Sequence, residues 1–134
     1  MNETGTAARA WMNPTESEQG SGDDLLGNAR ALVHLVNFAE PFGLSMIEAM
    51  ACGTPVIGRR RGSVPEVVDD GVTGYVVDDI GGGLEAVAKV GSLDRRAVRA
   101  RCAERFSRDR MVSDYLDVYD AVLAPERRTK VTVS

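Results

Sequence analysis

Two carboxylates eight residues apart, Glu40 and Glu48, flank the part of this 134-residue sequence that is best suited to bind an anionic ligand. Between them lies a predicted helix start at Phe42, Gly43 and Leu44. The first backbone N–H groups of a helix have no partner inside it, and a glycine lets a ligand approach the main chain closely. A diphosphate would fit there, because aligned peptide dipoles favour an anion at a helix N-terminus by about 0.3–1 kcal/mol.

Glu48 lies more than one helical turn beyond that N-terminus. From there its carboxylate can accept hydrogen bonds from a ribose diol, each worth about 1.5–3 kcal/mol. The same residue also falls in a predicted core-facing stripe with Leu44, Ile47 and Ala51. A carboxylate in an apolar face must either bind a partner or lie at the edge of the stripe in water. The periodicity alone leaves both interpretations open.

The elements that must position these residues follow from apolar runs and chain-breaking residues. An apolar run at residues 31–36 predicts a strand before the loop that carries Glu40, and Gly53 with Pro55 ends the helix. Further strands are predicted at 55–58 and 75–77, a glycine loop at 81–83, and helices at 84–90, 93–106 and from 107 onward. In such an open α/β sheet, ligands bind outside the carboxyl ends of the strands.

The residues after the second predicted strand extend this pattern and make it specific. The whole pattern comprises Glu40-Pro41-Phe42-Gly43-Leu44, Glu48, Gly53, Pro55, Gly62-Ser63-Val64-Pro65-Glu66 and Gly71-Val72-Thr73-Gly74-Tyr75. It resembles the C-terminal, donor-binding half of the retaining GT-B glycosyltransferases of family 4, the large group 1 family, over about residues 25–123. The resemblance implies an α/β fold: a partial Rossmann-like three-layer domain with a short parallel sheet, which forms the second half of a GT-B C-terminal domain.

By this resemblance the chain binds a nucleotide sugar and takes part in the transfer of its glycosyl group to an acceptor, with retention at the anomeric carbon. Glu40 would be the catalytic residue, in contact with the donor sugar near the reacting centre. The residues implied in substrate binding are Phe42, Gly43 and Leu44 through their backbones, Glu48 at the ribose, and Ser63 in the loop that borders the donor. No cofactor and no metal ion are expected, and the sequence has no Asp-x-Asp metal motif.

Three other features have competing interpretations. Ser63 and Glu66 have the spacing of a capping box with Ser63 as the N-cap, which would give both residues a structural role. The three arginines at residues 59–61 follow a predicted strand, either as a solvated turn or in contact with a donor phosphate. His34 is the sole histidine and is predicted to be structural, because metal or Ser-His-Asp chemistry would need partners that the sequence does not supply.

Composition limits the function classes. A net charge of −4 and a pI near 5.0 argue against a general nucleic-acid binder, which needs a concentrated basic surface. The sequence shows neither a membrane span nor a signal-peptide pattern, so a cytoplasmic protein is expected. Cys52 and Cys102 are too few for a disulfide framework, and both are predicted to be small buried residues.

The predicted nucleotide-sugar-binding domain occupies residues 25–124, and the segments on either side are expected to be less ordered. Residues 1–24 are polar and predicted to be disordered or loosely ordered, and residues 125–134 read as a basic tail. The last helix before that tail has a wide apolar face, which is predicted to be largely buried.

The predicted sheet is shorter than a doubly wound sheet, which has about five or six strands, so one edge should be unpaired. An N-terminal GT-B domain or a homo-oligomer partner is expected to cover that edge or the last helix. The preferred function is the donor-binding portion of a glycosyltransferase that is inactive without its N-terminal acceptor domain. The alternative is a noncatalytic nucleotide-sugar-binding or oligomerisation module.

Overall fold

The computed structural model describes residues 20–128, so residues 1–19 of the predicted N-terminal segment and residues 129–134 of the predicted tail lie outside the described part. Its α-helices are α2 (Gly20–Asn28), α3 (Leu44–Ala51), α4 (Val64–Val67), α5 (Ile80–Lys89), α6 (Arg95–Phe106) and α7 (Arg108–Arg128). Its strands are β1 (Leu32–His34), β2 (Val56–Arg59) and β3 (Gly74–Val77), and the 3-10 helix η2 (Val90–Ser92) follows α5.

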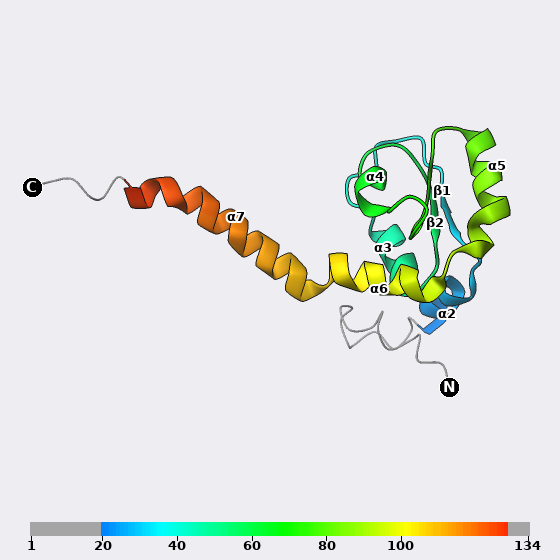
Figure 1. The fold of residues 1–134 in the computed structure, drawn as a ribbon, viewed down its shortest axis with the longest axis horizontal. Coiled ribbons are helices and arrows are strands. Elements are labelled where there is room, and N and C mark those ends of the chain that lie inside the picture. Colours follow the sequence, from blue (N-terminus) through cyan, green and yellow to red (C-terminus); the bar gives the residue numbers. More distant parts are fainter. Residues whose placement is uncertain (1–19, 129–134) are drawn as a thin grey trace, which may run out of the picture.

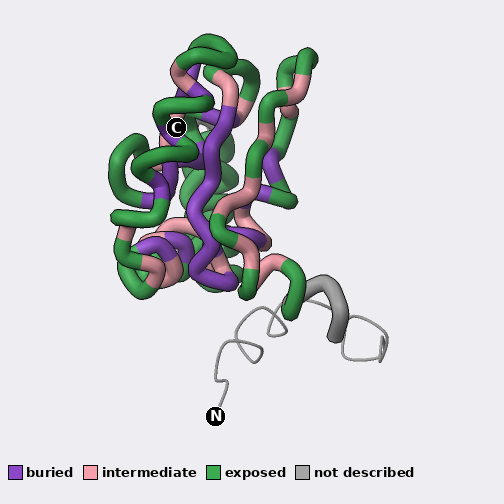
Figure 2. The backbone as a smooth tube through the Cα atoms, turned by 90° about the vertical axis from the view of Figure 1, so that its right-hand side faces the viewer, coloured by how far each residue is buried: buried purple, intermediate pink, exposed green. Residues whose placement is uncertain are grey.

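The three strands form one parallel sheet in the order β1-β2-β3. Leu32 of β1 pairs with Val56 of β2, which in turn pairs with Gly74 of β3. Residues 52–58, which include most of β2, are all buried and form the purple run through the middle of the body in Figure 2. Figure 1 shows α5 on one side of the sheet and α3 with α4 on the other. This arrangement confirms the predicted α/β class, with three layers and a short parallel sheet.

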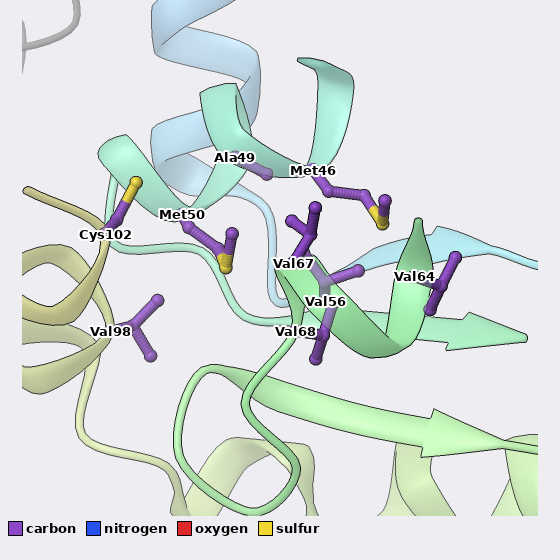
Figure 3. Packing of buried hydrophobic residues seen from close by; sticks show 9 residues of the cluster. All are labelled: Met46, Ala49, Met50, Val56, Val64, Val67, Val68, Val98 and Cys102. Atoms are coloured by element: carbon purple, nitrogen blue, oxygen red, sulfur yellow. The ribbon is translucent and has the colours of Figure 1, made fainter. Parts of the chain in front are cut away.

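The larger part of the core lies between α3, the sheet and α6. Met46, Ala49 and Met50 of α3 are fully buried, and they pack in one cluster with Val56 of β2 and Val98 of α6 (Figure 3). A smaller cluster joins the opposite face of the sheet to α5. Helix α3 therefore packs on two sides, against the sheet and against α6, and its N-terminus lies at the carboxyl edge of the sheet.

The predicted core-facing stripe of Leu44, Ile47 and Ala51 is wrong. Leu44 is 58% exposed, and Ile47 and Ala51 are only partly buried. The buried face instead carries residues 46, 49 and 50, which have the same helical spacing. Because α3 is apolar almost all round, periodicity cannot distinguish the two faces, and simultaneous packing on the sheet and α6 selects the methionine face.

The C-terminal end of α3 follows the predicted stop signal. Gly53 has a φ of 76° and donates its backbone N–H to Met50 O at 2.9 Å. Thr54 N donates to Ala49 O at 2.8 Å. These two bonds form a Schellman motif, in which a left-handed glycine satisfies the last carbonyls of the helix and turns the chain towards β2.

The three glycines at residues 81–83 lie inside α5, which corrects the loop predicted there. Asp79 is the N-cap, and its Oδ1 accepts a hydrogen bond from Gly82 N at 2.8 Å. This bond satisfies a backbone N–H group that has no partner inside the helix, so α5 begins at Ile80 rather than near Leu84.

Three arginines of α6 contact neighbouring elements of the described chain. Arg95 donates at 2.6–2.8 Å to two carbonyls at the end of α2 and to the buried hydroxyl of Thr54. Arg101 and Arg105 each pair with Asp69 at 2.6 Å. These contacts tie α6 to α2 and to the segment after α4, and they depend on tertiary neighbours that a charge pattern does not reveal.

Helix α7 extends away from the rest of the described chain (Figure 1). At its start, Ser107 Oγ accepts a hydrogen bond from Arg110 N at 3.2 Å, and the helix runs on to Arg128, beyond the predicted start of the tail. The prediction of a largely buried apolar face is wrong. The residues of this face are 46–67% exposed: Met111, Val112, Tyr115, Leu116, Val118, Tyr119, Val122 and Leu123. The described residues supply no surface on which this face could pack.

Both cysteines are buried, as predicted. Because Cys102 is buried, its ionisation makes the free energy of unfolding depend on alkaline pH. Desolvation raises the pKa of Cys102 from 9.0 to about 11. In the unfolded chain the thiol ionises first, so the free energy of unfolding should fall as pH rises from about 9 to 11, by about 2–3 kcal/mol. Urea unfolding at several pH values measures this loss. Cys102→Ala should abolish that component, and an equal pH dependence in the variant would contradict the assignment.

Candidate functional site

Glu40 occupies the loop between β1 and α3, and its carboxylate caps the N-terminus of α3. Oε1 accepts hydrogen bonds from Gly43 N at 3.1 Å and from Phe42 N at 3.4 Å, and the side chain is only 18% exposed. The sequence predicted these N–H groups to be free for a ligand. In this structure the carboxylate of Glu40 already takes the position of an anion there, which corrects that expectation and identifies the place as suited to negative charge.

Gly43 is the N-cap of α3 and adopts a φ of 79°, in the left-handed region that favours glycine. A Cβ at this position would lie 2.3 Å from Met46 Cε and 3.2 Å from Ser63 Oγ. The turn into α3 therefore favours glycine, and a larger residue would also have to displace the end of the Met46 side chain. The predicted helix start near Gly43 is confirmed, since Leu44 is the first helical residue.

The loop after β2 fixes the backbone of Glu40 from the other side. Ser63 N donates to Glu40 O at 2.7 Å. Gly62 has a φ of 54°, and a Cβ there would lie 2.3 Å from Glu40 O and 2.5 Å from Glu40 N. The two loops are thus in direct backbone contact, which places Ser63 beside the helix start.

The predicted capping box of Ser63 and Glu66 is wrong in its chemistry. Ser63 is the N-cap of α4, but its side chain makes no capping hydrogen bond, and its own backbone is helical, with φ −74° and ψ −12°. A capping serine needs an extended backbone to bring its hydroxyl to the helix amides. The Oγ atom is buried and has no hydrogen-bond partner among the described residues.

His34 is a site neighbour that the sequence reasoning missed. Its imidazole is 11% exposed, and Nε2 lies 3.5 Å from Oε2 of Glu40. A polar residue that interrupts an apolar strand six positions before Glu40 was the available signal. Sequence alone could not show that the loop folds back and brings the two side chains together.

Glu48 is partly buried on α3, and it lies one turn after the exposed Leu44. Residues at this spacing share a helix face, so Glu48 lies towards the outer side of α3 and not in the methionine face. The desolvation argument for a bound partner is therefore weaker than the sequence suggested. Its predicted role at a ribose stays a prediction.

The three arginines at residues 59–61 form a polar cluster beside the site, in which Arg60 and Arg61 are exposed to solvent. Arg59 and Arg61 each donate to Oδ1 of Asn37 at 3.4 Å, and Arg60 pairs with Asp78 at 2.9 Å. Arg59 also lines a cavity of about 460 Å³ at the carboxyl ends of the strands. The other residues that line it are Leu35, Asp79, Ile80 and Gly81. The cavity adjoins α5, on the opposite side of the sheet from α3.

Two further properties of the described part of the chain concern membranes and metal ions. None of its helices combines the length and apolarity needed to cross a membrane. Within the same residues there is no group of three or more His, Cys, Asp or Glu side chains that could hold a metal ion.

Known proteins resemble this chain in sequence. The profile of the family described as "Glycosyl transferases group 1" matches residues 15–89. The chain is 42% identical over 125 residues to a D-inositol 3-phosphate glycosyltransferase of Salinispora tropica, a match that covers 84% of this chain and 25% of the relative. It is 38% identical over 108 residues to an N-acetyl-alpha-D-glucosaminyl L-malate synthase of Bacillus anthracis, covering 75% of this chain and 28% of the relative. The chain thus spans about a quarter of the length of these relatives.

Solved structures share the fold. The Anabaena protein HepE, solved in complex with UDP, superposes with a TM-score of 0.54 at 24% sequence identity, over 75% of this chain and 29% of that chain. The same protein has also been solved in complex with UDP-glucose. This likeness supports the partial Rossmann-like architecture described above.

Proposed function

This chain belongs to the group 1 glycosyl transferase family, and from that premise we propose that it is the nucleotide-sugar-binding portion of a retaining GT-B glycosyltransferase of family 4. One observation carries the proposal: the backbone that leads into α3 already binds an anionic group, since the amides of Phe42 and Gly43 donate to the carboxylate of Glu40. A donor diphosphate or sugar oxygen arriving there would find aligned N–H groups at the carboxyl edge of a parallel sheet.

The proposed chemistry assigns different tasks to the N-terminus of α3 and to the glutamates Glu40 and Glu48. Donor oxygens replace the carboxylate of Glu40 on the amides of Phe42 and Gly43 and also bind the amide of Leu44, and Glu40 turns to the sugar near the reacting carbon. The N-terminus of α3 then stabilises the negative charge that develops on the leaving diphosphate, in the manner of an oxyanion hole. Glu48 binds the ribose. Ser63 contributes to the donor site its hydroxyl, which has no hydrogen-bond partner among the described residues. We expect the reaction to be cytoplasmic and to need no metal ion.

The remaining length of such an enzyme has to supply the acceptor site. The apolar face of α7 is exposed, and Val33 on the edge strand β1 is 53% exposed. We propose that an N-terminal GT-B domain covers these surfaces, and that the isolated chain is inactive without it. A homo-oligomer is the alternative cover, and sedimentation of the isolated chain at micromolar concentration separates the two, since a strict monomer excludes the oligomer.

Binding of the nucleotide sugar can be measured on the 134-residue chain alone, because it does not require transfer of the glycosyl group. Glu48→Gln should weaken binding of a nucleotide sugar about tenfold, because a neutral amide accepts hydrogen bonds from a ribose diol less strongly than a carboxylate. Isothermal titration with UDP-glucose, GDP-mannose and ADP-glucose measures the affinity. The matched control is Glu85→Gln, which changes an exposed glutamate on α5, at the opposite face of the sheet.

Two results would reject parts of the proposal. Absence of binding by the wild-type chain at millimolar donor would reject a donor site in it. Equal affinities of wild type and Glu48→Gln would remove Glu48 from the site. If donor binds but no sugar transfer appears after a separately produced N-terminal portion is added, the noncatalytic binding module becomes the better description.

A further inference from the structure

His34 and Glu40 form a buried polar pair that the proposed donor chemistry does not yet use. His34 ends β1, and its imidazole is 11% exposed. Its Nε2 atom is fully buried, and among the described residues it has no hydrogen-bond partner. A buried polar atom without a partner costs about 1–3 kcal/mol, so a purely structural residue at this position would be better as an aliphatic side chain.

The two oxygens of the Glu40 carboxylate face different neighbours. Oε1 accepts from the amides of Gly43 and Phe42, whereas Oε2 lies 3.5 Å from Nε2 of His34. That separation is longer than a hydrogen bond of this type, which is about 2.7–3.2 Å. A movement of the carboxylate by roughly half an ångström towards the imidazole would close the gap. Catalytic hydrogen bonds are often long before the ligand is bound and shorten in the complex.

We propose that His34 is a positioning residue for Glu40. The Nε2–H group of His34 donates to Oε2 of Glu40 and holds the carboxylate in place when donor oxygens displace Oε1 from the amides of Phe42 and Gly43. This inference rests on the proposed donor site. Without such a contact, the displaced carboxylate would rotate freely in its loop, and the sugar would lose a fixed hydrogen-bond acceptor. With it, Glu40 exchanges the amides of Phe42 and Gly43 for Nε2 of His34 and keeps a fixed orientation towards the sugar.

The first test needs no ligand. Because the chain has a single histidine, its ring ¹⁵N signals are unambiguous. We expect the proton to lie on Nε2 in the neutral ring, and Glu40→Gln to shift the Nε2 signal. Glu66→Gln, which changes an exposed glutamate in the neighbouring α4, is the control and should leave the signal unchanged. An Nε2 signal that is indifferent to Glu40→Gln would overturn the proposal whatever the function of the chain.

The second test uses donor binding. His34→Leu should weaken binding of UDP-glucose about tenfold and leave binding of UDP within about twofold, because the loss falls on the sugar-dependent contact of Glu40. His34→Gln places an amide N–H donor near the former Nε2 and should restore most of the UDP-glucose affinity. A residue that only fills space would not show this rescue, and equal loss of UDP and UDP-glucose would also overturn the proposal.

The two tests separate the failure of this inference from the failure of the proposed function. If the wild-type chain does not bind UDP-glucose, GDP-mannose or ADP-glucose, the donor site is rejected, and the ring signals still decide whether His34 holds Glu40. If the wild type binds UDP-glucose and His34→Leu binds it equally well, the donor site stands and the role of His34 falls. Amide spectra of each variant, compared with wild type, show whether it is folded.

Discussion

Gly62→Ala should lower the free energy of unfolding by about 2–5 kcal/mol and displace Glu40 from the N-terminus of α3. The φ of 54° costs a residue with a side chain about 1–2 kcal/mol. The new Cβ would also lie 2.3 Å from Glu40 O and 2.5 Å from Glu40 N, and such overpacking costs about 1–3 kcal/mol more. Because those contacts are backbone atoms, one of the two loops has to move. Urea unfolding measures the stability, and amide shifts of Phe42 and Gly43 report the displacement.

Gly71→Ala is the matched control for this prediction. Gly71 has a φ of 78°, but a Cβ there would have no heavy atom within 4 Å. The variant therefore carries the cost of the left-handed backbone without the clash, about 1–2 kcal/mol. The difference between the two variants isolates the contact between Gly62 and Glu40. Equal destabilisation, with unchanged amides at Phe42 and Gly43, would contradict the close approach of the two loops.

Glu40→Ala should separate donor binding from transfer. In the complete enzyme it should lower kcat by about 10²–10³-fold, the effect of removing one preorganised group that stabilises a transition state. Affinity for UDP should be unchanged or higher, because the carboxylate competes with the diphosphate for the amides of Phe42 and Gly43. Titration of the isolated chain with UDP and kinetics of the complete enzyme measure the two effects.

The opposite pattern would contradict this account of Glu40. If Glu40→Ala weakens UDP binding strongly, the carboxylate supports the diphosphate site and does not compete for it. If kcat is unchanged, Glu40 is only a helix cap. Unfolding in urea serves as the control, since removal of the cap alone should cost about 0.5–2 kcal/mol of stability.

The features of the fold that depend on local chemistry could be predicted from the sequence. Three apolar runs became the three parallel strands, and Gly53 ended α3 through its left-handed backbone. The same local reasoning predicted the start of α3 near Gly43. At both ends of α3 the decisive interactions lie within a few residues of the chain.

Features that depend on tertiary neighbours could not be predicted in this way. The buried face of α3 is chosen by α6 and the sheet, because two faces of an almost wholly apolar helix have equal periodicity. The spacing of Ser63 and Glu66 fits a capping box, but the backbone of Ser63 is helical and its side chain makes no capping hydrogen bond. The pairing of His34 with Glu40 and the exposed face of α7 likewise depend on where distant segments lie, or on surfaces beyond the described residues.

The central claim is that the N-terminus of α3 binds the activated end of a sugar donor. Its most direct test is the ¹⁵N amide spectrum of the 134-residue chain during titration with UDP-glucose. We predict that the largest shifts fall on Phe42, Gly43 and Leu44, because the first two amides exchange the carboxylate of Glu40 for donor oxygens and the Leu44 amide lies next to them. Shifts confined to the cavity lined by Arg59 and Ile80, or no shifts at millimolar ligand, would contradict it.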